Sequence, residues 1–318
     1  MVCNSIFETL TMINNDKKQS VEEFVKTFNF DSCVFELLKF IEKDNERIKN
    51  LVISKYLKMP LSASEEEDIL DYFISNSVFS AATLANPATS VVTEFLYEPK
   101  ASSIIDKYFS ASKGGDAIHS RIIRVEENLH LLIDKYLKNG KVLLGNLGGG
   151  PGRDVTDVFS KYYRDSDKVF SINIDKDKNA LKRGKRMAER GGVADRIKFL
   201  DASFTRHKPK EKFDIIILVG VLCGLPTETC ILLLKKIKPM LAKGGSIMVS
   251  NVAPKMLQDD PFTYFIMNDI MGWSLVFKEE AVLKDIFKKA GFEWQRNFTD
   301  DYGFHNMGVG VKKKSIFK

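Results

Sequence analysis

The sequence has few cysteines, no long apolar run and no recognisable targeting segment. The cysteines number four in 318 residues and form no Cys-x-x-Cys pair, so neither a disulfide framework nor a zinc site is indicated; they are Cys3, Cys33, Cys223 and Cys230. The longest nearly uncharged apolar stretch, Ile215 to Cys223, contains Gly220 and is shorter than the ~18 residues that a membrane-spanning helix needs. A secretory signal begins with a basic segment that is followed by an apolar one. Residues 1–15 do not show this pattern. We therefore expect a cytoplasmic protein without a membrane partner.

The charges are divided unevenly along the chain. Residues 1–110 carry 11 Lys and Arg against 17 Asp and Glu, whereas residues 111–318 carry 37 against 25. A basic half can bind an anionic ligand or a nucleic acid. However, the basic residues between Lys176 and Arg190 are mixed with Asp177 and Glu189 on one amphipathic segment and lack interleaved aromatic residues. This pattern favours a solvated helix face and disfavours a nucleic-acid partner.

The first third of the chain is predicted to be helical. Apolar residues recur at helical spacing from about residue 21 to residue 106, beginning with Val21, Phe24, Val25 and Phe28. A Ser/Gly-rich stretch at 110–116 precedes a long amphipathic helix, which we predict over Ala117–Leu137. We therefore expect two domains: residues 1–110 form a helical lid or substrate domain, and residues 111–318 form a second domain.

The second domain alternates strand-length apolar runs with helical segments. Such alternation predicts a doubly wound α/β domain with a mostly parallel sheet. The helices between the strands are expected near Asp154–Tyr163, Lys178–Arg190 and Pro226–Leu241. The seven strands are expected at Lys141–Asn146, Lys168–Asp175, Ile197–Asp201, Phe213–Val219, Gly245–Asn251, Phe292–Thr299 and Asn306–Lys312.

A glycine-rich loop follows the first of these strands. Glycines occupy positions 148, 149, 150 and 152, and a helix with Asp154 in its first turn comes next. Glycine allows sharp turns and close approach of a ligand, and a helix N-terminus offers free N–H groups to it. The dinucleotide fingerprint would need a glycine where Arg153 stands, so the spacing disfavours NAD. A tight turn without a ligand is the weaker alternative.

Two acidic residues end the next two strands. Asp175 lies about 20 residues beyond the loop, where a carboxylate can accept hydrogen bonds from ribose hydroxyls. Asp201 ends the third strand, where a carboxylate beside backbone amides can hold an exocyclic amine of adenine. The carboxyl ends of these strands meet at one edge of the sheet, where doubly wound domains bind their ligands.

These elements, taken in order, resemble the class I S-adenosylmethionine-dependent methyltransferases over roughly residues 140–312. The resemblance implies a seven-stranded Rossmann-like sheet with the last strand antiparallel, and S-adenosylmethionine as cofactor. It places the cofactor contacts at Asn146, Gly148, Gly149, Gly150, Gly152, Asp175, Asp201, Ala202 and Val219. Many members carry an acid where Asn146 stands, which weakens the assignment of a partner for the methionine ammonium group. No metal is implied.

The acceptor side of the site carries weaker signals. The fourth strand ends without the motifs of nucleic-acid base methylation, so we expect a small-molecule acceptor; nothing in the sequence indicates the oligomeric state. His119 and Arg121 are candidate catalytic residues on the long helix, although capping or packing of that helix is the more ordinary role for His119. His305 falls in the turn of the terminal hairpin, where histidines are usually exposed. The aromatic segment 262–277 either walls the acceptor pocket or forms an ordinary core helix.

Other functions stay open at this point. Transfer of the aminopropyl arm of the same cofactor, as in nicotianamine-synthase-like proteins, would use a similar sheet and helical domain. A catalytically silent protein that only binds the cofactor is an alternative of another class.

Overall fold

The computed structural model describes residues 32–86, 89–98 and 103–313. The predicted helical stretch around Val21–Phe28, and Cys3, lie outside these ranges. The chain divides into two compact units. Within the described ranges, the first unit comprises residues 32–86, 98, 103–112 and 260–273, and the second comprises 89–97, 113–259 and 274–313.

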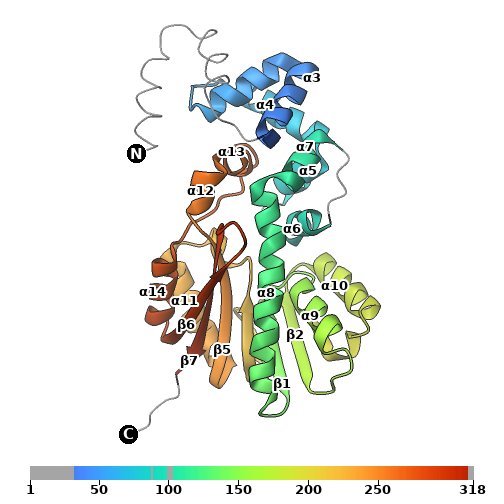
Figure 1. Ribbon diagram of the computed structural model, residues 1–318, viewed down its shortest axis with the longest axis vertical. Helices are drawn as coiled ribbons and strands as arrows, with labels where there is room; N and C mark the ends of the chain where they lie inside the picture. Colours follow the sequence, from blue (N-terminus) through green and yellow to red (C-terminus); the bar gives the residue numbers. More distant parts are fainter. Residues whose placement is uncertain (1–31, 87–88, 99–102, 314–318) are drawn as a thin grey trace. The chain divides into compact units, whose positions relative to one another are not determined.

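The second unit is built on a seven-stranded sheet (Figure 1). The strand order is β3-β2-β1-β4-β5-β7-β6, in which β1 to β5 run parallel and β7 runs antiparallel to both of its neighbours. The predicted fold is therefore confirmed. The strands are β1 (Val142–Leu147), β2 (Val169–Asp175), β3 (Ile197–Asp201), β4 (Phe213–Leu218), β5 (Leu241–Val252), β6 (Phe292–Thr299) and β7 (His305–Lys312).

Helices cover both faces of this sheet. On one face, α8, α9 and α10 contribute to a core with Ile215 and Ile217 of β4. On the other face, α11 and α14 pack against Ile216 and Leu218 of the same strand. This alternation explains the near-continuous apolar run of β4, because both of its faces are buried. The helices are α8 (Lys113–Leu137), α9 (Arg153–Tyr162), α10 (Lys178–Arg190), α11 (Thr227–Ile237) and α14 (Glu280–Lys289).

The structure corrects the expected start of the long helix. α8 begins at Lys113 rather than at Ala117, so the predicted Ser/Gly-rich linker ends inside a helix. Gly114 and Gly115 are buried in the first turn. Glycine costs about 1 kcal/mol in a helix interior, but a first turn that is buried by packing can tolerate it. The long helix is thus continuous from the end of the first unit to β1.

The units do not follow a single boundary at residue 110. α6 (Ser90–Tyr97) belongs to the second unit and lies beside α8 (Figure 1). Its polar side chains are hydrogen-bonded by arginines of the sheet-covering helices, as described below. The polar side chains that attach α6 do not follow a hydrophobic period. The sequence pattern therefore could not assign this short helix to the second unit.

The first unit is helical and includes the aromatic segment that follows β5. Tyr56 packs its ring against the rings of Phe262 and Phe265, at centroid distances of 5.2 and 5.1 Å. The hydroxyl of Tyr108 lies 2.7 Å from that of Thr263. The aromatic segment therefore forms part of the core of the first unit. Its helices are α3 (Ser32–Tyr56), α4 (Ala63–Asn76), α5 (Val78–Ala85), α7 (Ile104–Ala111), α13 (Pro261–Phe265) and the π-helical turn η5 (Ile266–Ile270).

Candidate functional site

The glycine loop after β1 adopts a backbone that requires glycine. Gly148, Gly150 and Gly152 have φ angles of 68°, 54° and 69°, in the left-handed region that side chains disfavour. A Cβ atom at Gly150 would also lie 2.8 Å from Cβ of Ser90 in α6. The loop is thus shaped for close approach, and α6 covers part of it.

Two buried asparagines support the loop from the sheet. A Cβ atom at Gly149 would lie 2.4 Å from both Nδ2 of Asn146 and Oδ1 of Asn173. Asn173 donates a hydrogen bond from Nδ2 to the carbonyl oxygen of Gly150 at 2.8 Å. The Oδ1 atoms of Asn146 and Asn173 are buried and have no hydrogen-bond partner. Because buried polar atoms are nearly always paired, both mark a place where a ligand or water is expected.

Asp175 at the end of β2 is bonded to this loop. Its Oδ2 accepts a hydrogen bond from the N–H of Gly150 at 2.8 Å, and its Oδ1 accepts one from the N–H of Asp177 at 2.9 Å. A carboxylate has about four acceptor positions, so two remain for ribose hydroxyls. Asp175 therefore shapes the loop as well as offering acceptors to a ligand.

Asp154 is a buried acid that the sequence analysis did not place in the site. Asn146 donates a hydrogen bond to its Oδ1 at 2.9 Å, and the N–H of Val155 donates to the same oxygen at 2.9 Å. Burial raises the pKa of Asp154 to about 6, although both hydrogen bonds act in the opposite direction. A buried acid therefore lies in contact with the side chain of Asn146, eight residues later in the sequence.

The other expected cofactor contacts lie at the same edge. Asp201 ends β3 opposite Asp175 in the strand register. Its side chain is 48% exposed and lies 3.5 Å from Nζ of Lys178. The N–H of Ala202 donates to the carbonyl oxygen of Asp175 at 3.0 Å, and Val219 packs against the core at the end of β4. Their contacts with a cofactor stay predictions.

Three arginines from three helices hold one side of α6. Arg153, the residue that breaks the dinucleotide fingerprint, pairs with Glu94 at 2.8 Å. Arg183 of α10 donates to the hydroxyl of Ser90 at 3.1 Å, and Arg121 of α8 donates to the hydroxyl of Tyr97 at 2.8 Å. Ser90, Glu94 and Tyr97 are four and three residues apart and so share one helix face. These bonds fix α6 over the glycine loop.

Arg121 is a buried cation without an acidic hydrogen-bond partner among the described residues. Its side chain is 6% exposed, and its Nε has no hydrogen-bond partner. The guanidinium is close enough to Asp154 to act against the rise in the pKa of that acid. An unpaired buried charge is costly, so the arrangement fits an anionic ligand.

The two candidate histidines occupy different environments. His119 is exposed on α8 between the buried residues Ile118 and Ser120, and its catalytic role stays a prediction. His305 is only 4% exposed, which contradicts the expectation of an exposed turn residue. Its Nδ1 lies 3.0 Å from Oδ2 of Asp300. The sequence signal that could have found it is Asp300, which stands five residues earlier in the tight turn before β7.

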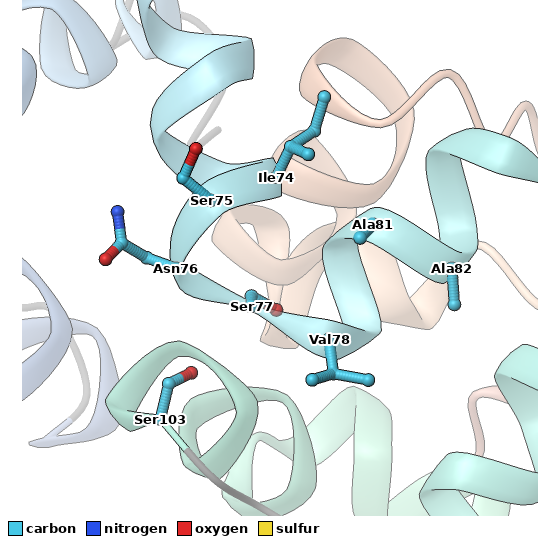
Figure 2. Close-up of a pocket in the computed structure, with 8 residues that line it drawn as sticks. All are labelled: Ile74, Ser75, Asn76, Ser77, Val78, Ala81, Ala82 and Ser103. Atoms are coloured by element: carbon cyan, nitrogen blue, oxygen red, sulfur yellow. The ribbon is translucent and has the colours of Figure 1, made fainter.

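A surface hollow of about 610 Å³ on the first unit (Figure 2) is lined only by neutral side chains of α4, α5 and Ser103. One of them, Ser77, already caps α5 and donates to Asp106 at 2.7 Å. Among the residues that the structure describes, no group of three His, Cys, Asp or Glu side chains could hold a metal ion. In the same ranges, no helix has the length and apolar character to cross a bilayer.

A family model described as a methyltransferase domain matches residues 137–297, which is just over half of the chain. The chain belongs to the methyltransferase-domain family. It is a member of the S-adenosylmethionine-dependent methyltransferases, as the sequence resemblance implied. The matched region includes β1 to β5, the glycine loop and all of β6 except its last two residues.

Solved structures share the fold of this methyltransferase at low sequence identity. A Bordetella parapertussis protein described as a possible exported protein is 14% identical, with a TM-score of 0.66 over 84% of this chain and 96% of that chain. Magnesium protoporphyrin IX methyltransferase from Synechocystis PCC 6803 with bound S-adenosylhomocysteine is 15% identical, with a TM-score of 0.53 over 78% and 99%. The same enzyme with bound S-adenosylmethionine is 15% identical, with a TM-score of 0.51 over 80% and 100%. No curated protein matches the sequence significantly.

Proposed function

We propose that this methyltransferase binds S-adenosylmethionine at the glycine loop and transfers its methyl group to a small-molecule acceptor. The observation that carries the proposal is a pair of buried, opposite charges beside the loop. Asp154 has an Oδ2 without a hydrogen-bond partner among the described residues, and Arg121 has an unpaired Nε. Each charge is held by neutral partners, namely Asn146 and Tyr97.

These charges suit the methionine end of the cofactor. An ammonium group would bind the Asp154 carboxylate, and a carboxylate group would bind the Arg121 guanidinium, through charge-assisted hydrogen bonds. Glycine is required at positions 149 and 150 because a Cβ atom there would clash with Asn146 and Asn173 or with Ser90. Asp175 and Asp201 are then the acids for the ribose and the adenine, in the positions that the family resemblance implied.

The bound cofactor supplies a methyl group that its sulfonium has already activated. The protein's own residues need to orient the acceptor and keep water away. α6 contributes to this, because Arg121, Arg153 and Arg183 fasten it beside the glycine loop. That residues 1–110 act as a lid stays a prediction.

A small-molecule acceptor is supported by one comparison and one sequence feature. The Synechocystis enzyme is named for magnesium protoporphyrin IX, a small molecule. The loop after β4, from Val219 to Pro226, contains none of the motifs typical of nucleic-acid base methylation. Both observations favour the same class of acceptor.

Turnover products test the proposal. The full chain is incubated with S-adenosylmethionine and the small-molecule fraction of a cell extract, and the products are identified by mass spectrometry. We expect S-adenosylhomocysteine. Release of methylthioadenosine would show aminopropyl transfer instead, and cofactor binding without either product would favour the silent binder.

A further inference from the structure

His305 lies at the edge of the sheet where the proposed transfer takes place. It is the first residue of β7 and pairs with Val252, the last residue of β5. Because β7 is antiparallel to β5, its first residue lies at the carboxyl edge of the parallel strands. Met307 and Val309 pack into the core under α8, and alternate residues of a strand share a face. His305 therefore lies on the face that carries α8 and Arg121.

The turn before β7 fixes the imidazole in one orientation. Oδ2 of Asp300 lies 3.0 Å from Nδ1 of His305 and also accepts the backbone N–H of His305. Oδ1 of Asp300 accepts the N–H of Tyr302 at 2.8 Å. With both oxygens bonded inside the turn, Asp300 is committed to holding His305. Nε2 of His305 has no hydrogen-bond partner among the described residues.

The turn itself is anchored to α8 on one helix face. The hydroxyl of Ser120 accepts the N–H of Asp301 at 2.8 Å, and Arg124 donates to the Asp301 carboxylate at 2.7 and 2.9 Å. The hydroxyl of Tyr302 donates to Asp116 at 3.0 Å. These bonds place Arg121, which follows Ser120, next to the Asp300 and His305 pair, and its charge acts on both.

The protonation state of the pair suits a base. Burial acts to raise the pKa of Asp300, but the hydrogen bonds from His305 and Tyr302 outweigh it and hold that pKa below its usual value. Burial lowers the pKa of His305 despite its bond to Asp300, and the Arg121 charge acts in the same direction as burial. The imidazole is thus neutral near pH 7. Since a carboxylate can only accept, the proton is on Nδ1 and the lone pair is on Nε2.

We propose that His305, oriented by Asp300, is the proton acceptor of the methyl transfer, and that the acceptor molecule presents a neutral O–H or N–H group. This rests on the proposed function. The acceptor proton moves to Nε2 of His305, and the lone pair on the acceptor oxygen or nitrogen forms the new bond to the methyl carbon. The electron pair of the methyl–sulfur bond stays on sulfur. The products are the methylated acceptor, neutral S-adenosylhomocysteine and a protonated His305, which returns its proton to water.

Three variants of the full chain test this role. General-base catalysis contributes about 10²–10⁴-fold, so His305→Ala is expected to lower S-adenosylhomocysteine formation with the extract by at least about 100-fold. Its affinity for S-adenosylhomocysteine, measured by calorimetry, is expected to stay within about twofold, as for a group acting in the transition state. Added imidazole is expected to restore part of the rate. His130→Gln is the matched control, because His130 bonds Tyr163 at the end of α9, away from the carboxyl edge.

Asp300→Asn separates positioning from folding, because an amide keeps the size of the carboxylate. It can donate to Nδ1 and so move the imidazole proton to Nε2. We expect a rate loss between those of wild type and His305→Ala, together with a changed tautomer signature in ¹⁵N-histidine NMR spectra. A wild-type rate in both His305→Ala and Asp300→Asn would overturn the proposal. A rate loss matched by an equal loss of cofactor affinity, without rescue by imidazole, would overturn it as well.

The NMR measurement also distinguishes this proposal from the proposed function. If the wild-type chain binds S-adenosylhomocysteine but forms none with the extract, the proposed transfer fails on its own account. The spectrum of wild-type His305 then decides the present assignment. A neutral imidazole protonated on Nδ1 at pH 7.5 supports it, and a protonated imidazolium or an Nε2–H tautomer overturns it.

Discussion

The carboxyl edge of the sheet has two halves that are built in different ways. Around the glycine loop, the site depends on backbone conformations and on side chains between residues 146 and 175. These residues belong to three consecutive elements, β1, α9 and β2, and to the loops between them. Near the end of β5, the important side chains are Arg121 of α8, Asp300 of the turn before β7, and His305, the first residue of β7. The first half is therefore visible as a sequence motif. The second half exists only once the chain has folded.

The two halves also use charge differently. In the first half, a buried acid beside two buried amides faces the backbone of the loop, and burial raises its pKa to about 6. In the second half, Asp300 accepts three hydrogen bonds, has a lowered pKa and orients the imidazole of His305. The first arrangement suits binding a cation, whereas the second suits holding a neutral base. The following predictions test this division, beginning with the largest effect.

Gly149→Ala should weaken cofactor binding in the first half more than any other change. Its Cβ would lie 2.4 Å from the amides of Asn146 and Asn173, so both must move. We expect at least about 3 kcal/mol of lost binding free energy, roughly 100-fold in affinity for S-adenosylhomocysteine by calorimetry. Gly224→Ala is the control, because a Cβ atom there would meet nothing within 4 Å. Equal affinity in both variants would contradict the described loop.

Asp154→Asn should weaken binding while preserving the fold. The amide can still accept the hydrogen bonds from Asn146 and Val155, but it carries no charge for an ammonium group. We expect a loss of about 2 kcal/mol, roughly 30-fold in affinity at pH 7.5. Wild-type affinity should also fall as the pH drops below about 6, where Asp154 becomes protonated, and the variant should lack this dependence. Asp167→Asn, an exposed acid, is the control.

The same substitution should leave stability unchanged or higher. The pKa of Asp154 is raised in the folded state from 3.8 to about 6, so the folded protein binds more protons than the unfolded chain between these values. Stability is therefore lost as the pH rises through this window. At pH 7.5, Asp154→Asn should unfold at a temperature equal to or above that of wild type. A variant that loses both stability and affinity would show a structural role only.

Asp175→Ala and Asp201→Ala rank the two acids that end β2 and β3. Asp175 is bonded to the loop at Gly150, so its removal should cost about 1–3 kcal/mol of binding free energy for S-adenosylhomocysteine. Asp201 is half exposed, and exposed charge interactions are worth about 1 kcal/mol or less. Calorimetry at fixed salt concentration checks the order. A larger effect at Asp201 would place the main cofactor contacts at β3 instead.

The smallest expected effect concerns the attachment of α6. A double-mutant cycle of Glu94→Gln and Arg153→Gln should give a coupling free energy of about 0.5–1 kcal/mol in denaturant unfolding, because the two side chains keep 17% and 19% of their surface exposed and solvent still screens part of their attraction. Hydrogen exchange of α6 should rise in either variant. Unchanged exchange would mean that this ion pair does not hold α6 on the second unit.

The sequence predicted the fold well for definite physical reasons. The two-sided burial of Ile215–Leu218 and the alternation of strands and helices are local patterns, and each strand was placed within a few residues. The misplaced boundaries fall where composition misleads: Gly114 and Gly115 are typical of linkers, yet packing keeps them helical. The short helix α6 was missed as a part of the second unit because its attachment depends on arginines from three other helices.

The candidate site was predictable only in its first half. The glycines and Asp175 can be recognised in the sequence by their spacing after a strand. The link between Asp154 and Asn146 is a hydrogen bond that only the structure shows. His119 and His305 show the limit most clearly. The sequence offered His119 as a candidate for its place on the long helix, and that role stays a prediction; it expected His305 to be exposed, whereas the structure buries His305 against Asp300. Burial of a turn residue depends on contacts with α8 that lie about 180 residues away along the chain.

The most direct test of the account is a calorimetric titration of the full wild-type chain with S-adenosylhomocysteine and, separately, with NAD. The left-handed glycines, Asp154 and Arg121 predict that S-adenosylhomocysteine binds at one site per chain and that NAD does not bind measurably. The measured proton uptake or release should change sign or size near pH 6, where Asp154 titrates. Tight binding of NAD together with no binding of S-adenosylhomocysteine would contradict the central claim.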